Sequence, residues 1–137
     1  MRHHRCGFSL IELLAALAIV AVLAAVAVPA YGHYAYRARR VDGKELLWRI
    51  ADAQERYYAT YSRYGELSDL GFAEPVLSEK GFYEATLRLD GRQSFTAMAS
   101  PVAMQAADVC GVLALDDTGR QTPALDDVVA NGNGGCW

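Results

Sequence analysis

The chain has 137 residues, of which 53% are hydrophobic, and its formal net charge is −3. This length predicts one compact domain, and the acidic balance argues against a protein that binds nucleic acid over a broad surface. The apolar residues are concentrated at the N-terminus. We therefore expect one membrane-length segment followed by about a hundred residues that form a small core.

A basic start precedes the apolar segment. Residues 13–30 contain no charged side chain, and as a helix rising about 1.5 Å per residue they extend roughly 27 Å, close to the hydrocarbon thickness of a bilayer. Arg2 and Arg5 predict an N-terminus that stays in the cytoplasm while the remaining chain is exported. No small-residue motif of an ordinary secretory signal closes the segment, so we expect a membrane anchor.

Glu12 is a single carboxylate near the start of this apolar segment. A carboxylate in a membrane segment is costly and normally needs a partner. No Lys or Arg lies at helical spacing within the apolar residues to supply one. Two interpretations stay open: the side chain reaches water at the membrane surface, or its partner comes from another molecule.

The cysteines predict one disulfide. Cys6 lies in the basic start, away from Cys110 and Cys136. In a bacterium, the predicted orientation places the later part of the chain outside the inner membrane, where disulfides persist. We expect Cys110 and Cys136 to form a bridge, with a stabilisation of about 3–4 kcal/mol in the chain-entropy estimate. The alternative is two free thiols.

Beyond Tyr31 the spacing of the apolar residues predicts a helix with one buried face. Residues three to four apart on that face are Leu47, Ile50, Ala53 or Gln54, Tyr57, Tyr61 and Tyr64. Gly65 is expected just past the end of the helix, so one helix spans about residues 8–64. Residues 66–80 lack periodicity and predict a long loop, which is a candidate interaction surface.

The second half of the chain predicts an antiparallel sheet. Alternating residues predict strands at 83–89, 94–100 and 109–115, with a short fourth strand near 120–122. Asp90 and Gly91 are a hairpin signal between the first two. The tail from Pro123 to Trp137 is expected to be a loop that the bridge holds in place. The expected fold class is α+β: a long N-terminal helix packed on a three- to four-stranded antiparallel sheet.

The N-terminal motif resembles that of type IV pilin precursors. It consists of the basic start, the sequence GFSLIELL at residues 7–14, and the apolar segment. Residues 39–72, the Cys110–Gly111 pair and the terminal Cys136–Trp137 are similar to minor pilins of the PilE type. The resemblance implies a type IV pilin fold with a leader at 1–7, a transmembrane and filament-core helix at 8–30, and a periplasmic head domain at 31–137.

The resemblance also implies roles for four N-terminal residues. Prepilin peptidase would cut between Gly7 and Phe8, and Phe8 would then be N-methylated. Glu12 would pair with the freed Phe8 amine of a neighbouring subunit, and this pairing would set the register between subunits. Pro29 would be a helix break, acting either as a soft point in the filament or as a simple kink near the membrane surface.

Three groups of side chains have two interpretations each. The first group consists of tyrosines that either pack against the sheet or stack on nucleic acid together with Arg56 and Arg63: Tyr57, Tyr58, Tyr61 and Tyr64. The second group is basic and either forms a solvated face or contacts lipid head groups or acidic groups of neighbouring subunits: Arg37, Arg39, Arg40 and Lys44. The third group is acidic and either lies in solvated turns or forms a calcium site: Asp116, Asp117, Asp126 and Asp127.

No catalytic or metal-binding motif is present in the sequence, so we expect neither enzymatic activity nor a cofactor. The expected function is that of a structural subunit, a minor pilin that takes part in pilus assembly, twitching motility, adhesion or DNA uptake. The alternatives are a type II secretion pseudopilin and a pilus-borne adhesin or DNA-binding module. Nucleic acid is not an expected partner, because acidic residues outnumber basic ones beyond Leu89.

The resemblance implies the other partners and the location. They are other pilins, both major and minor, prepilin peptidase, the inner-membrane assembly platform, and the bilayer before assembly. The subunit would cross the bacterial inner membrane once before assembly and lie in the pilus at the cell surface afterwards.

Overall fold

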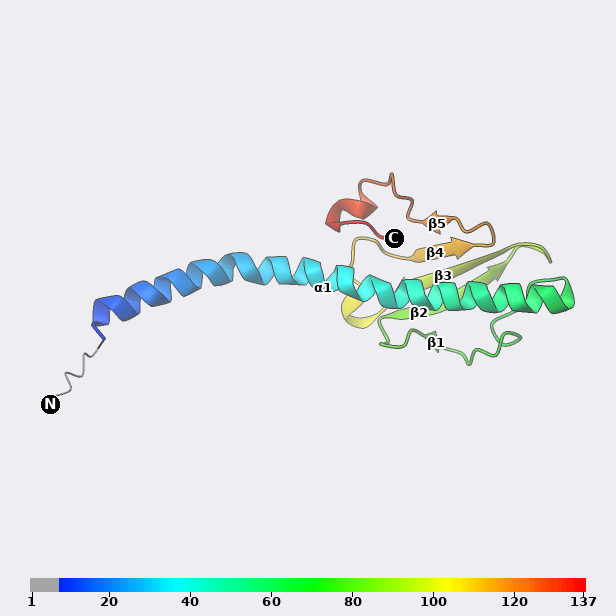
Figure 1. Ribbon diagram of the computed structural model, residues 1–137, viewed down its shortest axis with the longest axis horizontal. Coiled ribbons are helices and arrows are strands. Elements are labelled where there is room, and N and C mark those ends of the chain that lie inside the picture. Colours follow the sequence, from blue (N-terminus) through cyan, green and yellow to red (C-terminus); the bar gives the residue numbers. More distant parts are fainter. Residues whose placement is uncertain (1–7) are drawn as a thin grey trace, which may run out of the picture. The chain divides into compact units, whose positions relative to one another are not determined.

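The computed structural model describes residues 8–137, apart from the side chains of Pro29 and Ala30. The chain divides into two compact units, one ending at Tyr34 and one from Ala35 to Trp137, here called the head. Helix α1 (Leu10–Tyr61) contributes to both units. The head adds β1 (Val76–Leu77), β2 (Tyr83–Leu89), β3 (Phe95–Pro101), β4 (Leu113–Asp116) and β5 (Gln121–Thr122) (Figure 1).

The N-terminal part of α1 leaves its apolar side chains uncovered. Among the described residues, α1 is the one helix long and apolar enough to cross a membrane, with a mean hydropathy of 2.8 over 18 residues, none of them buried. The first turn is closed by the Ser9 carbonyl, which accepts the N–H groups of Glu12 and Leu13. Glu12 lies in this first turn, where the helix dipole favours a negative charge.

The helix continues through Pro29. Residues 25–30 are helical, so the described backbone has no helix break at Pro29. A proline inside a helix removes one backbone hydrogen bond and crowds one carbonyl, and the intact turns on either side maintain the helix across this defect. A soft point that opens in the filament stays a prediction.

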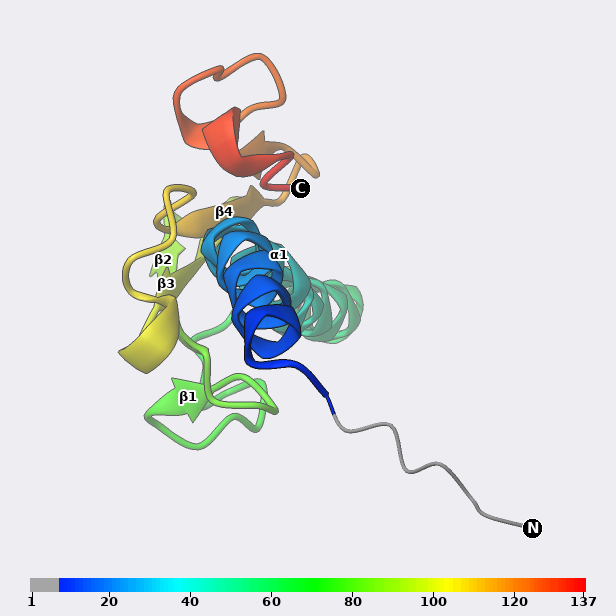
Figure 2. The same cartoon turned by 90° about the vertical axis from the view of Figure 1, so that its left-hand side faces the viewer.

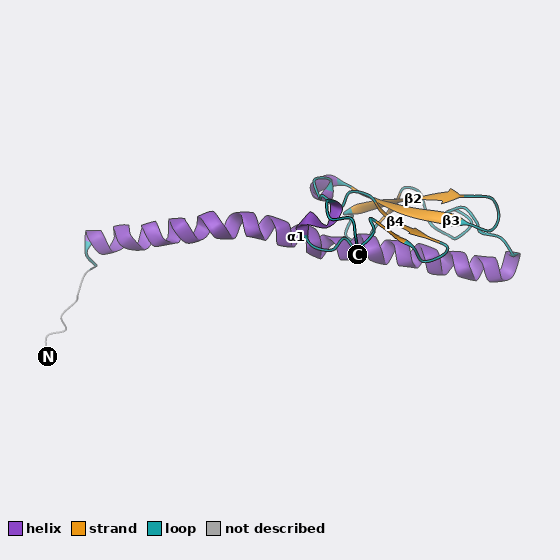
Figure 3. Ribbon diagram, turned by 90° about the horizontal axis from the view of Figure 1, so that it is seen from above, coloured by secondary structure: helices purple, strands orange, loops and turns teal. Residues whose placement is uncertain are grey.

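The core of the head lies between α1 and one face of the sheet (Figures 1 and 3). The helix contributes Leu46, Leu47 and Ile50 to this core. The sheet contributes Tyr83, Ala85, Phe95, Ala97, Ala99, Leu113 and Leu115. At Gly43 the helix packs directly against the Tyr83 ring. A Cβ atom at this position would lie 2.8 Å from the ring, which is too close.

The helix ends at Tyr61, three residues earlier than predicted, and Gly65 is not its terminal residue. Ser62 adopts the left-handed conformation, with φ at 52°. Gly65 is held by the buried Gln54, which donates to the Gly65 carbonyl over 2.7 Å and accepts the Gly65 N–H over 3.0 Å. Tyr64 turns back onto Phe95. A buried amide therefore sets this turn, which the local pattern of residues does not reveal.

The sheet is antiparallel and has five strands in the order β1-β2-β3-β4-β5, where three to four were predicted. Strand β2 has the predicted bounds, and all seven of its residues pair with β3. Strand β1 lies within the segment predicted to be a loop. The third predicted strand begins at Leu113, because residues 103–111 form the η1 turn (Ala103–Gln105) and further turns instead.

The predicted bridge between Cys110 and Cys136 is present. The tail that it closes is not entirely loop, because Ala130–Asn133 form a short 3-10 turn, η2. Figure 2 shows this C-terminal segment and β1 at opposite edges of the sheet. The bridge and the buried core residues all lie within Ala35–Trp137, so the head contains what it needs to fold alone.

We expect Cys136→Ser to lower the free energy of unfolding of the head by about 3 kcal/mol, because the opened loop regains chain entropy. Urea unfolding under oxidising conditions measures this loss, and limited proteolysis reports release of the tail. The double variant Cys110→Ser/Cys136→Ser is the matched control and should unfold like the single variant, because each lacks the bridge. Unchanged stability of the single variant would contradict the expectation.

Candidate functional site

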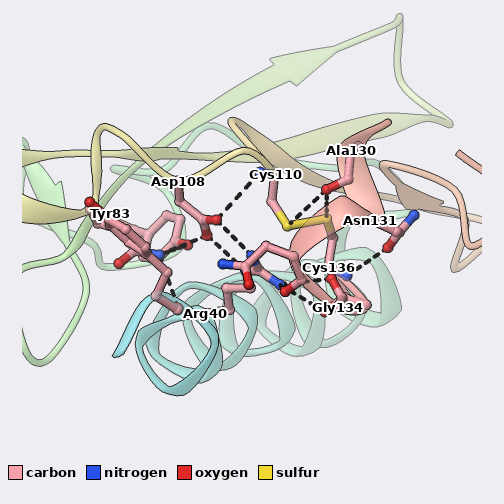
Figure 4. Close-up of polar contacts among 12 residues, drawn as sticks. Arg40, Tyr83, Asp108, Cys110, Ala130, Asn131, Gly134 and Cys136 are labelled. Carbon is pink, nitrogen blue, oxygen red and sulfur yellow. Dashed lines mark hydrogen bonds and ion pairs between the residues drawn. A yellow bond between two sulfur atoms is a disulfide. The ribbon is translucent and has the colours of Figure 1, made fainter. Parts of the chain in front are cut away.

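Arg40 lies at the centre of a buried polar cluster beside the disulfide (Figure 4). Its side chain is 1% exposed and binds both carboxylate oxygens of Asp108, at 2.7 and 2.6 Å. The remaining terminal nitrogen donates to the carbonyls of Asn133, Gly134 and Gly135. The guanidinium thus joins α1 to the segment between β3 and β4 and to the C-terminal tail.

Gln105 connects this cluster to the sheet. Its amide nitrogen donates to Asp108 over 2.9 Å and to the Tyr83 hydroxyl over 3.1 Å. Burial raises the pKa of Tyr83 to about 12, so this hydroxyl stays protonated at neutral pH. Burial, and next the positive charge of Arg40, lower the pKa of Lys44. The hydrogen bonds of the cluster hold α1, β2, the segment between β3 and β4 and the tail together, and we call it the clamp.

The clamp corrects the expectation for the basic residues after the membrane segment. Arg40 is an internal ion-pair partner and is not available to lipid or to a neighbouring subunit. Arg39 lies over the Phe82 ring at 4.9 Å from its centroid. Asp108 is also buried, so it adds no charge to the surface of the head. The helical spacing of Arg40 with Gly43 and Leu47 is the sequence signal that could have revealed its burial.

The tyrosines near the end of α1 divide into two groups. The rings of Tyr58 and Tyr64 contact each other, with centroids 4.8 Å apart and planes tilted by 37°. Both pack in or against the core, as the packing interpretation predicts. Tyr57 and Tyr61 form a second pair, with ring centroids 4.4 Å apart and planes tilted by 35°, and Tyr61 is 59% exposed. Arg63 donates to the Tyr57 hydroxyl over 3.0 Å and lies over its ring. We call Tyr57, Tyr61 and Arg63 the tyrosine–arginine corner.

The acidic turns use their carboxylates to hold the chain. Asp116 accepts from the backbone of Thr118 and Arg120 and from the Thr118 hydroxyl. Asp117 accepts from the Ser94 hydroxyl and the Phe95 N–H, and Asp127 accepts the N–H groups of Val129 and Ala130 at the start of η2. Among residues 8–137, no three metal-ligating side chains are grouped closely enough to hold an ion. These bonds account for Asp116, Asp117 and Asp127 as parts of turns.

The N-terminal site residues predicted from the resemblance are only partly described. Gly7, and with it the cleavage position, lies outside the described residues. Phe8 and Glu12 are exposed in the single chain. The registration role of Glu12 stays a prediction.

Comparison with protein families gives two matches that together span residues 2–114. The family model described as "Type IV minor pilin ComP, DNA uptake sequence receptor" matches residues 29–114, which is more than half of the chain. This chain belongs to that family of type IV minor pilins. The prokaryotic N-terminal methylation motif matches residues 2–28.

A solved structure and a search of curated proteins complete the comparison. A type IV pilin from Shewanella oneidensis is 26% identical, with a TM-score of 0.55, and the match covers 74% of this chain and 97% of that chain. The fold is thus the type IV pilin fold predicted from the N-terminal motif. Among curated proteins there is no match.

The family decides between the pilus subunit and the secretion pseudopilin. The chain is a minor pilin of a type IV pilus, and not the pseudopilin considered above. Its family and fold are structural rather than enzymatic. The methylation motif and the apolar helix make it an inner-membrane pilin before assembly and a subunit of the surface pilus afterwards. Assembly with other pilins and processing by prepilin peptidase follow from the family.

Proposed function

We propose that this minor pilin contacts DNA during uptake and that its N-terminal helix joins it to the pilus. The observation that supports the DNA role is the family match over residues 29–114, whose description names a DNA uptake sequence receptor. These residues include the second half of α1 and strands β1 to β3. The proposal reverses the expectation that nucleic acid is not a partner.

The N-terminal helix supplies the assembly role. Cleavage after Gly7 frees an amine on Phe8, which is then methylated, four residues before Glu12. In a bundle of such helices, Glu12 of one subunit pairs with the Phe8 amine of its neighbour. An unpaired carboxylate in a dry bundle is strongly unfavourable, so the pair selects one register between subunits. The uncovered apolar side chains of α1 become buried in the same bundle.

DNA binding needs a local surface, because the head as a whole is acidic. It carries eleven Lys and Arg residues against fifteen Asp and Glu residues. The tyrosine–arginine corner offers the required chemistry: the exposed Tyr61, beside the half-buried Tyr57, to contact bases, and Arg63 to contact phosphate. The Tyr64 N–H donates to the Arg92 carbonyl, so the β2–β3 hairpin with its exposed Arg92 lies next to the residue that follows Arg63.

We expect Tyr61→Ala to weaken DNA binding by the head about tenfold, since aromatic contact with a base contributes roughly 1–3 kcal/mol. Arg63→Ala should weaken binding of every DNA sequence and lower the salt slope by about one. Fluorescence anisotropy with a labelled duplex and with its single strand measures both effects. Lys80→Ala is the charge control, because exposed Lys80 lies near Asp42 at the other end of the sheet.

Two outcomes separate the parts of this proposal. If the unaltered head binds neither the duplex nor the single strand, the DNA role itself is wrong. If it binds DNA and the corner variants bind as tightly as Lys80→Ala, the DNA role stands and the corner is not the contact surface.

A further inference from the structure

Strand β2 is paired along its whole length on one side only. Strand β3 pairs with every residue from Tyr83 to Leu89. On the other side, β1 has only two residues and pairs with Glu84 and Ala85. The segment from Thr86 to Leu89 therefore has a strand neighbour on the β3 side alone.

The backbone alternation shows which groups face the open side. The Tyr83 carbonyl accepts the Ser78 N–H on the β1 side, whereas the Phe82 carbonyl accepts the Val102 N–H on the β3 side. Because successive residues in a strand direct their backbone groups to opposite sides, Ala85, Leu87 and Leu89 face the β1 side. Strand β1 ends opposite Ala85, so Leu87 and Leu89 direct their backbone groups past its end.

A groove of about 560 Å³ adjoins this edge and overlaps it at Thr86 and Leu87. Strand β2 forms one wall, and the segment between α1 and β1 forms the other; the lining residues are Glu66, Leu67, Glu74, Pro75, Val76 and Glu84 to Leu87. The second wall forms hydrogen bonds within itself, including Phe72 N–H to the Leu67 carbonyl and Leu70 N–H to the Glu66 carbonyl. Its own backbone therefore does not complete the sheet edge.

The charge of the groove selects its occupant. Three carboxylates, from Glu66, Glu74 and Glu84, line it, and no Lys or Arg of residues 8–137 does so. This charge repels DNA and attracts a basic polypeptide. A second copy of the chain is a poor source, since the densest basic run among the described residues, Arg37 to Arg40, is helical.

We propose that this groove binds an extended basic segment of another protein, which adds as a strand to the free edge of β2. Strand addition supplies main-chain hydrogen bonds for affinity, and alternate side chains supply specificity. Lys or Arg side chains at every second position of the segment would face the glutamates. This site is separate from the tyrosine–arginine corner and does not depend on the DNA role.

The test is an NMR titration of the ¹⁵N-labelled head with the synthetic peptide acetyl-Lys-Val-Lys-Val-Lys-amide. The proposal predicts saturable shifts of the Leu87 and Leu89 amides. The acidic peptide acetyl-Glu-Val-Glu-Val-Glu-amide should cause none. A peptide with proline in place of the central lysine should bind at least about tenfold more weakly, because proline removes a donor needed for the added strand.

Variants of the groove complete the test. Glu74→Lys/Glu84→Lys should weaken binding of the basic peptide at least about tenfold, while Glu45→Lys, an exposed position on α1, should not. Equal binding of the proline peptide, shifts confined to α1, or no saturable shift would each overturn the proposal. Self-association of the head with shifts at Leu87 and Leu89 would overturn it too, because the occupant would then be a second copy.

Discussion

Replacing Arg40 with methionine is expected to lower the free energy of unfolding of the head by about 3–5 kcal/mol. The change removes one partner of a buried ion pair and leaves the Asp108 carboxylate buried without its counter-charge. It also leaves the carbonyls of Asn133, Gly134 and Gly135 without their donor. Urea unfolding of the head measures the loss, and Arg49→Met, an exposed position on the same helix, is the matched control.

A double-mutant cycle shows whether the ion pair itself causes the effect. Arg40→Met/Asp108→Leu should be less destabilised than the sum of the two single variants, because neither charge is then buried alone. Additive losses would show that packing of the arginine stem, and not the ion pair, stabilises the head. A loss below about 1 kcal/mol for Arg40→Met would contradict the clamp altogether.

Replacing Glu12 with alanine is expected to remove most of the minor pilin from sheared pili while leaving its precursor in the inner membrane. The carboxylate is exposed in the single chain, so its loss does not disturb the head. In the filament it would leave the neighbouring Phe8 amine without a partner, which penalises entry of the subunit. Immunoblots of pilus and membrane fractions, with immunogold labelling, measure the distribution.

Leu14→Ala is the matched control for Glu12→Ala, because it shortens a side chain of the same helix turn and keeps the charge pair. It should enter pili nearly as well as the unaltered subunit. Gly7→Val tests the origin of the amine, because a subunit that is not cut has no free amine on Phe8. Normal amounts of Glu12→Ala in pili, or assembly of an uncut Gly7→Val subunit, would contradict the registration role.

The hairpin and the membrane helix were predictable because their signals are local. Alternation of side chains over Tyr83–Leu89 reflects burial of one face, and Asp90-Gly91 favours a tight turn whatever surrounds it. The apolar segment needs nothing but its own length and composition to be suited to a membrane. The bridge between Cys110 and Cys136 followed from the number of cysteines and the expected compartment.

The end of α1 and the first strand were mispredicted because neither depends on a local signal. Gly65 follows a run of tyrosines and therefore resembles the residue after a helix end. Its position is instead set by two hydrogen bonds with Gln54, which lies eleven residues earlier in the sequence. Strand β1 has two residues, which is too short for a detectable period. It is a strand because it pairs with β2.

The chain's residues, read in order, were enough to establish an anchor, an α+β head and a pilin precursor, because hydrophobic length, side-chain period and the GFSLIELL motif are properties of neighbouring residues. Which charged side chains are buried could be established only from the folded chain. Arg40 belongs to a basic run that looks solvated, and Asp108 lies 68 residues away. A charge is buried only where a distant partner and several carbonyls converge on it, and that convergence is a product of tertiary packing.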